Sequence, residues 1–266
     1  MQPADLIKRA LYPIHELASD AGRALVERCR ADMAVSGALA LVGFLTDEAV
    51  ALLAAEAEAL EPLAHPYAAE HTVYFAPADD SLAPDHPGRQ MVRSAKRGVP
   101  YDCIPRGALL RTLYEWDALL EFVGAILGEP VLYRHGDALA ALNINVHGAG
   151  EELGWHFDRT DFAITLSLRQ NDAGGIFEYI PDTRDDIAGV TAALAGDRSK
   201  VRVMDSGPGT LSLFRGHHSL HRVTPGEGST TRLMAALSYD RQPDVQFSAY
   251  ARKLFYGRDT ERSAVV

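Results

Sequence analysis

The 266-residue chain has only two cysteines, Cys29 and Cys103. Two thiols cannot build a disulfide framework, and their spacing is neither that of a CxxC redox site nor that of a zinc site. The first residues also lack the apolar core and small-residue cleavage site of a secretion signal. The sequence therefore predicts free thiols in a reducing compartment, and we expect a cytoplasmic protein.

Long hydrophobic runs and an excess of positive charge are missing as well. The apolar run 38–45 is far too short to span a bilayer, so we expect no membrane partner. Lys and Arg number 26 against 36 Asp and Glu, which gives a net charge of -10. Because phosphate binding depends on clustered Lys and Arg, this balance argues against a nucleic-acid partner.

A hydrophobic content of 47% and a charged content of 23% are ordinary for a folded globular protein. No linker rich in Ser, Gly or Pro divides the chain, so we predict a single domain over 1–266. Within it we expect a mainly helical elaboration at 1–129, a jelly-roll core at 130–257 and a frayed tail at 258–266. Whether two copies form a homodimer is left open.

In the N-terminal part, apolar residues at spacings of three and four predict helical structure over 6–33, with Pro13 marking a start or a kink, and a helix over 116–127 that ends before Gly128. Thr46 is followed by two acidic residues and predicts an N-cap, with a helix continuing to about residue 60. The run 38–45 before it predicts a strand.

From residue 130 onward, short runs of period two are separated by Gly, Asp and Pro turns. The predicted strands are 131–134, 139–146, 162–168, 175–180, 201–204, 210–214, 220–223 and 232–239, with a small helical insertion at 188–197. Successive short strands favour an antiparallel sandwich or jelly roll, because a parallel sheet needs crossover helices. We therefore predict an α+β, mainly β fold whose N-terminal helices pack on a jelly-roll sheet.

The first candidate for chemistry is His156-Phe157-Asp158. In an extended chain, alternation puts His156 and Asp158 on one face and Phe157 on the other, so two ligands point at one metal. Such a pair alone is weak support for a site, since the chain has 10 histidines.

A second element strengthens this interpretation. His221 lies in the run Leu-His-Arg-Val, and Arg232 opens the following apolar strand. Two histidines and one carboxylate form the facial triad of non-haem iron(II) oxygenases, which leaves positions open for a keto acid and O2. Because its planar fork binds both oxygens of a carboxylate, Arg232 suits the far end of 2-oxoglutarate.

Around these residues the sequence resembles the 2-oxoglutarate-dependent non-haem iron oxygenases, and within them the BesD-like amino-acid halogenases and hydroxylases. The resemblance covers residues 89–257 and is carried by the runs 153–158, 161–162, 174–179, 209–211 and 214–225, with Arg232. It implies a double-stranded β-helix (cupin-like) core, Fe(II) held by His156, Asp158 and His221, and conversion of 2-oxoglutarate and O2 to succinate and CO2.

Halogenating members of that group have Gly or Ala where this chain has Asp158, which frees a coordination position for chloride. The carboxylate here favours hydroxylation over halogenation. We expect hydroxylation of an unactivated C–H bond in a small polar metabolite, a free amino acid or a derivative of one. Desaturation or cyclisation on the same kind of substrate is the alternative outcome.

Several neighbours have two interpretations. His217 and His218 compete with His221 but precede its strand, so we place them in the turn. Arg222 is expected to point outward from the strand. Asn143 and Asn145 alternate with apolar residues and either line the cavity, Asn145 toward 2-oxoglutarate and Asn143 toward substrate, or form an ordinary polar face.

A further set consists of polar or aromatic residues near the metal motif, with one from a basic stretch earlier in the chain. Each is a candidate substrate contact or a packing or surface residue: Trp155, Arg159, Asp161, Glu178 and Arg93. Arg93 belongs to a locally basic stretch that reads as a solvated loop or as a clamp for a carboxylate or phosphate: Arg89, Arg93, Lys96, Arg97, Arg106 and Arg111.

Two competing functions remain at this point. One is oxidative repair of nucleic acid, against which the acidic balance counts. The other is a non-catalytic cupin-like module that holds a structural metal. Turnover of 2-oxoglutarate would separate the second from an oxygenase.

Overall fold

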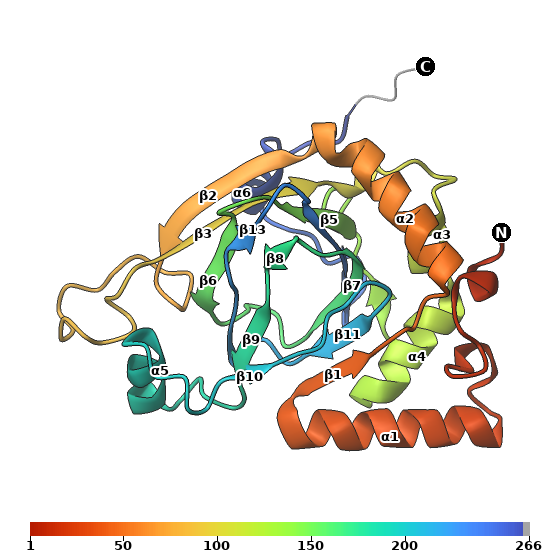
Figure 1. The fold of residues 1–266 in the computed structure, drawn as a ribbon, viewed down its shortest axis with the longest axis horizontal. Helices are drawn as coiled ribbons and strands as arrows, with labels where there is room; N and C mark the ends of the chain where they lie inside the picture. Colours follow the sequence, from red (N-terminus) through yellow and green to blue (C-terminus); the bar gives the residue numbers. More distant parts are fainter. Residues whose placement is uncertain (263–266) are drawn as a thin grey trace.

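An antiparallel sheet of eleven strands curls on itself at the centre of the computed structural model, which describes residues 1–262 (Figure 1). The strand order is β1-β11-β7-β14-β5-β3-β6-β12-β9-β10, with β2 pairing β3 outside this path. The strands are β1 (Ala38–Leu41), β2 (His65–His71), β3 (Val92–Val99), β5 (Leu142–His147), β6 (Glu152–His156), β7 (Ala163–Arg169), β9 (Phe177–Ile180), β10 (Arg202–Val203), β11 (Leu211–Phe214), β12 (Leu220–Val223) and β14 (Arg232–Leu237).

Two small sheets and a set of helices complete the fold. The small sheets pair β8 (Ala173–Gly174) with β13 (Gly226–Glu227) and β4 (Tyr133–Arg134) with β15 (Tyr239–Asp240). The helices are α1 (Asp20–Ser36), α2 (Asp47–Leu60), α3 (Leu109–Tyr114), α4 (Asp117–Leu127), α5 (Ile187–Leu194) and α6 (Ala249–Tyr256), with short 3-10 turns η1 (Pro3–Leu6), η2 (Ile14–Glu16), η3 (Glu61–Leu63) and η4 (Tyr101–Cys103). Helices α1 to α4 gather on one side of the curled sheet (Figure 1). This is the predicted mainly β, jelly-roll architecture.

The two faces of the sheet differ because side chains alternate along each strand. On β5, Leu142, Ile144 and Val146 are fully buried in the main core, beneath the helices. Asn143 and Asn145 point to the opposite face, which is the inner face of the curl. An apolar outer layer therefore stabilises the sheet, while polar side chains are left for its interior.

Local signals place the helices as the sequence predicts. The Thr46 side chain accepts from the Ala49 amide at 3.2 Å and begins α2. Gly128 ends α4 in a left-handed conformation, with φ 74°. The predicted insertion at 188–197 is confirmed as α5.

Two N-terminal predictions are wrong in extent. The segment 6–33 is not one helix, because α1 begins only at Asp20, where the Ser19 side chain caps it, and the residues before it form η1 and η2. The strand predicted at 38–45 ends at Leu41, since the chain turns at Gly43 with φ 64°.

The sheet also begins earlier than residue 130. Strand β3 lies between β5 and β6, and β2 pairs with β3, so the stretch read as a solvated basic loop contains a central strand. Strand β6 and helix α6 were not predicted either. At the C-terminal end Arg258 is anchored by Asp102 at 2.5 Å, so the tail is not frayed there; residues 263–266 lie outside the described part.

No helix within residues 1–262 combines the length and the apolar character needed to cross a membrane.

Two adjacent leucines on α2 test the packing of the helices on the sheet. Leu53 is 0% exposed, whereas Leu52 is 39% exposed. Because Leu53→Ala leaves a cavity in the core, we expect it to lower the free energy of unfolding by about 2–5 kcal/mol. The matched change Leu52→Ala should alter it by about 0.5 kcal/mol. Urea denaturation checks both, and equal losses would contradict the packing described.

Candidate metal centre

Strands β6 and β12 bring the two predicted histidine ligands together. His156 and His221 are cross-strand partners, with ring centroids 4.1 Å apart. Asp158, just after β6, places Oδ1 3.6 Å from His156 Nε2 and 3.5 Å from His221 Nε2. One ligand atom from each residue lies within 4.8 Å of the other two, so the three converge on one point. Two imidazole nitrogens and one carboxylate oxygen fit a divalent transition metal.

The second nitrogen of each imidazole has a backbone partner. His156 Nδ1 lies 2.7 Å from the Gly154 carbonyl, and His221 Nδ1 lies 2.9 Å from the Ser219 carbonyl. A carbonyl only accepts, so each Nδ1 carries the proton and each Nε2 presents its lone pair to the metal position. The two backbone carbonyls therefore orient both rings so that each Nε2 can bind a metal.

Three phenylalanines enclose the imidazoles. The rings of Phe177 and Phe214 lie 5.6 and 4.8 Å from that of His221, and the ring of Phe75 lies 5.0 Å from that of His156. Phe75 has a left-handed backbone, with φ 53°, which a non-glycine residue adopts at a cost. This apolar wall limits the access of water to the histidines.

Burial and the neighbouring charges set the protonation of the ligands. Burial, followed by the proximity of His221, lowers the pKa of His156 to about 3. Burial by itself would raise the pKa of Asp158, but the charge and hydrogen bond of His221 outweigh it and hold the pKa at about 2. At neutral pH the site therefore offers a neutral imidazole and an ionised carboxylate, the forms that bind metal.

The Asp158 carboxylate lies against Gly216, in the turn before β12. A Cβ at Gly216 would be 1.8 Å from Asp158 Oδ2, so only glycine permits this approach. The backbone holds the two segments together, since the Asp158 amide donates to the Gly216 carbonyl at 3.0 Å. Glycine here lets the carboxylate approach both imidazoles.

Arg232 lies on the inner face, opposite His147 on β5. Its side chain is buried, with 3% of the residue exposed, and its Nε has no hydrogen-bond partner within residues 1–262. Burial lowers the pKa of the guanidinium to about 10, which still leaves it charged at neutral pH. A buried cation with an open donor fits a carboxylate ligand.

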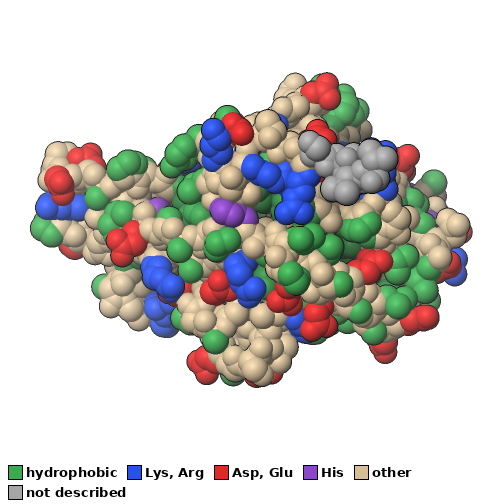
Figure 2. All heavy atoms as spheres, turned by 90° about the horizontal axis from the view of Figure 1, so that it is seen from above, with side chains coloured by type: hydrophobic (Ala, Val, Ile, Leu, Met, Phe, Trp, Pro, Cys, Tyr) green, Lys and Arg blue, Asp and Glu red, His purple; other side chains and the backbone are tan. Residues whose placement is uncertain are grey.

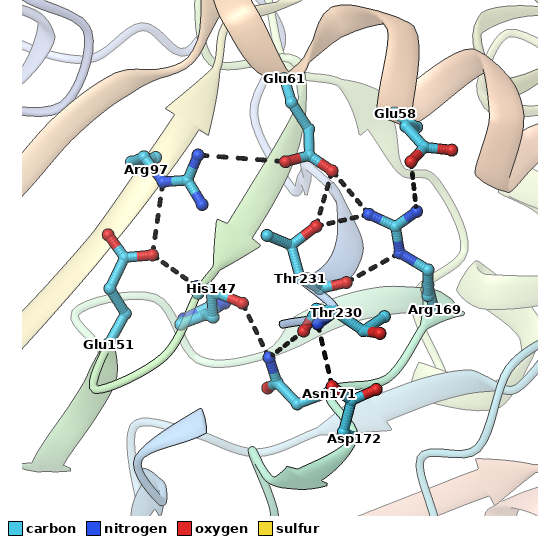
Figure 3. Close-up of polar contacts among 11 residues, drawn as sticks. Glu58, Glu61, Arg97, His147, Glu151, Arg169, Asn171, Asp172, Thr230 and Thr231 are labelled. Atoms are coloured by element: carbon cyan, nitrogen blue, oxygen red, sulfur yellow. Dashed lines mark hydrogen bonds and ion pairs between the residues drawn. The ribbon is translucent and has the colours of Figure 1, made fainter. Parts of the chain in front are cut away.

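A polar network holds the end of β14 that carries Arg232 (Figure 3). Glu61 accepts from Arg169 Nη2 at 2.6 Å and from the Thr231 hydroxyl at 2.7 Å, and it lies 3.9 Å from Arg97. The network thus joins η3, β3 and β7 to the residue just before Arg232, which limits the movement of that strand end.

Asn171 extends this support. Its amide donates to the carbonyls of His147 and Thr230, at 3.0 and 2.9 Å (Figure 3). Gly175 allows the close packing, because a Cβ there would lie 2.4 Å from Asn171 Oδ1 and 3.2 Å from Arg232 Cδ. The position of the guanidinium is therefore defined by its neighbours from three strands or loops.

Lys96, from the basic stretch that the sequence predicts as either a solvated loop or a clamp for a carboxylate or phosphate, lies on the inner face. Its Nζ donates to Asn145 Oδ1 at 2.5 Å, across β3 and β5. The signal was the alternation within β3, where Ser94, Lys96 and Gly98 share one face and Arg97 the other. The charged residues of this strand occur on both faces, at 93, 96 and 97, and hid that alternation. Asn143, two residues before Asn145, is on the same inner face.

Trp155, Glu178 and Arg222 form a separate group on the outer side of the sheet. Arg222 pairs with Glu178 at 2.6 Å and stacks on the Trp155 ring at 4.8 Å, while Trp155 packs in an apolar cluster with Val73 and Ile180. Alternation turns Trp155 and Glu178 away from the metal position, so the structure does not bring these two candidate contacts to it. The outward orientation of Arg222 is as expected.

The other candidate contacts also have partners at the surface. Arg93 is exposed on β3 and pairs with Glu152 at 3.4 Å, on the face opposite Lys96. Arg159 is exposed and donates to the Phe75 carbonyl, while Asp161 is exposed and pairs with Arg241. The structure does not bring these three to the metal position.

His217 and His218 occupy the turn before β12, as the sequence predicts. His217 Nδ1 lies 3.1 Å from the Asp158 carbonyl, and neither residue joins the ligand cluster formed within residues 1–262.

Several solved structures share this fold. HygX from Streptomyces hygroscopicus, with nickel and 2-oxoglutarate bound, has 13% identity and a TM-score of 0.56, covering 83% of this chain and 89% of its own. A 2OG-Fe(II) oxygenase family protein from Burkholderia pseudomallei has 16% identity and a TM-score of 0.51, covering 83% and 92%. A prolyl-4-hydroxylase from Pseudomonas putida has 16% identity and a TM-score of 0.50, covering 79% and 96%. The fold is that of the Fe(II)/2-oxoglutarate-dependent oxygenases.

A family model gives the finer assignment. The model described as Halogenase D matches residues 22–253, and the chain belongs to this family. No curated protein sequence is similar enough to count as a relative.

A substitution that adds one methyl group at Gly216 tests its contact with Asp158. In Gly216→Ala the new Cβ must displace the carboxylate, so we expect metal affinity to fall about 10- to 100-fold. Gly107→Ala is the matched control, since a Cβ at Gly107 meets no atom within 4 Å. Calorimetric titration with Zn²⁺ measures both variants. Unchanged affinity in Gly216→Ala would show that Asp158 is not a ligand.

His147 should make the stability of the metal-free protein depend on pH. Burial lowers its pKa well below 6.5. Below pH 6.5 the unfolded chain therefore binds a proton that the folded protein does not, and the free energy of unfolding falls as the pH decreases. We expect His147→Gln to reduce this slope by about 1.4 kcal/mol per pH unit and His218→Gln, an exposed control, to leave it unchanged. Urea denaturation between pH 7.5 and 5 is the measurement; an identical slope in His147→Gln would disprove it.

Proposed function

We propose that this protein is an Fe(II)- and 2-oxoglutarate-dependent oxygenase that hydroxylates an unactivated C–H bond of a small polar metabolite. The observation that supports it most is the convergence of His156, Asp158 and His221 on one point of the inner face that also carries Arg232. A facial triad leaves half of the coordination sphere of iron for ligands other than the protein.

The roles of the residues follow from their chemistry. His156, Asp158 and His221 hold the metal, and Arg232 holds the C5 carboxylate of 2-oxoglutarate with its fixed fork of donors. Iron bound there supplies the activation of O2, coupled to the decarboxylation of 2-oxoglutarate to succinate and CO2. The phenylalanines around the imidazoles exclude water, which protects a reactive site from side reactions.

Hydroxylation is favoured over halogenation by the third ligand, although the family is described as Halogenase D. A halide must take a metal position that a protein ligand leaves free. Here the Asp158 carboxylate lies within 3.6 Å of both Nε2 atoms, and Gly216 accommodates it. Halogenation remains the second candidate because of the family description.

A small polar substrate, a free amino acid or a derivative, agrees with the amides of Asn143 and Asn145 on the inner face and with the resemblance to amino-acid hydroxylases. Nucleic acid is disfavoured by the net charge of -10 and by the surface, where basic side chains lie in small groups among acidic ones on the face shown in Figure 2. Desaturation or cyclisation would use the same residues.

Succinate formation tests the proposal directly. We expect the iron-loaded protein to convert 2-oxoglutarate to succinate, faster with its substrate among the amino acids and related metabolites screened. Mass analysis should show one added oxygen; loss of two hydrogens would indicate desaturation, and chlorine incorporation from a chloride buffer would identify a halogenase. Asp158→Gly should lose hydroxylation. Absence of any turnover in the wild-type protein would instead favour a non-catalytic metal-binding module.

A further inference from the structure

Lys96 differs from the other lysines in its partner. The chain has four lysines, and Lys8, Lys200 and Lys253 each pair with an aspartate, at 2.9, 3.8 and 3.0 Å. Lys96 Nζ contacts the neutral amide oxygen of Asn145 instead. Among residues 1–262 it has no carboxylate within 4.0 Å, whereas Arg97, the next residue, pairs with Glu151 at 3.4 Å on the other face.

Lys96 lies near the other polar residues of the inner face. Its strand β3 adjoins β5, which carries Asn145 and His147, and β5 adjoins β14, which carries Arg232. The ring of Phe255, from α6, covers the ammonium group at 5.8 Å. Lys96 and Arg232 are therefore two cations on the same inner face, on strands β3 and β14, which are separated by β5 alone. Both are partly shielded from solvent.

The electrostatics agree with this placement. Burial is the main cause that lowers the pKa of Lys96, to about 8. The negative charge of Asp158 raises this pKa and the positive charge of Arg232 lowers it. The amine is still mostly protonated at pH 7. A shielded cation whose hydrogen-bond partner is neutral loses hydration without forming a close ion pair, which is unfavourable unless a ligand supplies the anion.

We propose that the Lys96 ammonium, aligned by Asn145, binds a carboxylate group of a ligand on the inner face, as a second anchor beside Arg232. This rests on the proposed function. Two ligands can bring the carboxylate: 2-oxoglutarate, or a substrate with an amino-acid carboxylate. Arg232 satisfies one end of 2-oxoglutarate and the metal the other, so the substrate carboxylate needs a cation of its own.

The test measures binding to the zinc-loaded protein by calorimetry, first of 2-oxoglutarate and then of the standard L-amino acids at saturating 2-oxoglutarate. Lys96→Met removes the charge at similar length, and Lys96→Arg retains it. Asn145→Asp offers Lys96 an internal carboxylate that competes with the ligand. Lys200→Met is the matched control, an exposed lysine with the same chemical change.

Loss of one charge-assisted hydrogen bond should weaken carboxylate binding about 10- to 100-fold in Lys96→Met and in Asn145→Asp. Lys96→Arg should restore most of the affinity, and Lys200→Met should match wild type. Weaker binding of 2-oxoglutarate assigns Lys96 to the co-substrate; weaker binding of an amino acid alone assigns it to the substrate. If wild type binds 2-oxoglutarate and Lys96→Met binds every probe equally well, the inference is overturned while the proposed function stands. Failure of wild type to bind 2-oxoglutarate would refute the proposed function itself.

Discussion

The candidate site depends on the pairing of β6 with β12. Hydrogen bonds between these strands set His156 beside His221, and the turn at Gly216 brings the Asp158 carboxylate to both. Backbone carbonyls then fix each imidazole with Nε2 toward the metal position. Ladder geometry therefore determines ligand geometry, and a shift of one residue in register would turn a histidine to the opposite face.

Because side chains alternate along the strands, the two faces of the sheet carry different kinds of polar residue. On the outer side, the group of Trp155, Arg222 and Glu178 satisfies its own charges and packs against apolar neighbours. On the inner side, Arg232 and His147 have ring or guanidinium nitrogens without partners among the described residues, and Lys96 has only an amide. Such groups cost stability in a finished core, so their concentration on one face marks it as a surface for ligands.

The rest of the molecule keeps this face in shape. Helices α1 to α4 cover the outer layer of the sheet, and the network centred on Glu61 ties η3 to the strand ends near Arg232 (Figure 3). The family whose model matches residues 22–253 is described as Halogenase D, whereas in this chain a carboxylate, that of Asp158, converges with the two histidines.

The sequence alone identified the three residues that converge, together with Arg232, the mainly β class and the capped helices α2 and α4, because period, spacing and capping residues are local properties. Local pattern did not reveal that β3 is a central strand, since its charged residues resemble a solvent-exposed loop. It also left Trp155 and Glu178 as either substrate contacts or packing residues, and Lys96 as part of either a solvated loop or a clamp for a carboxylate. Only the tertiary structure decided these points, because the direction of a side chain depends on which strands pair and in which register, and those partners are far away in the sequence.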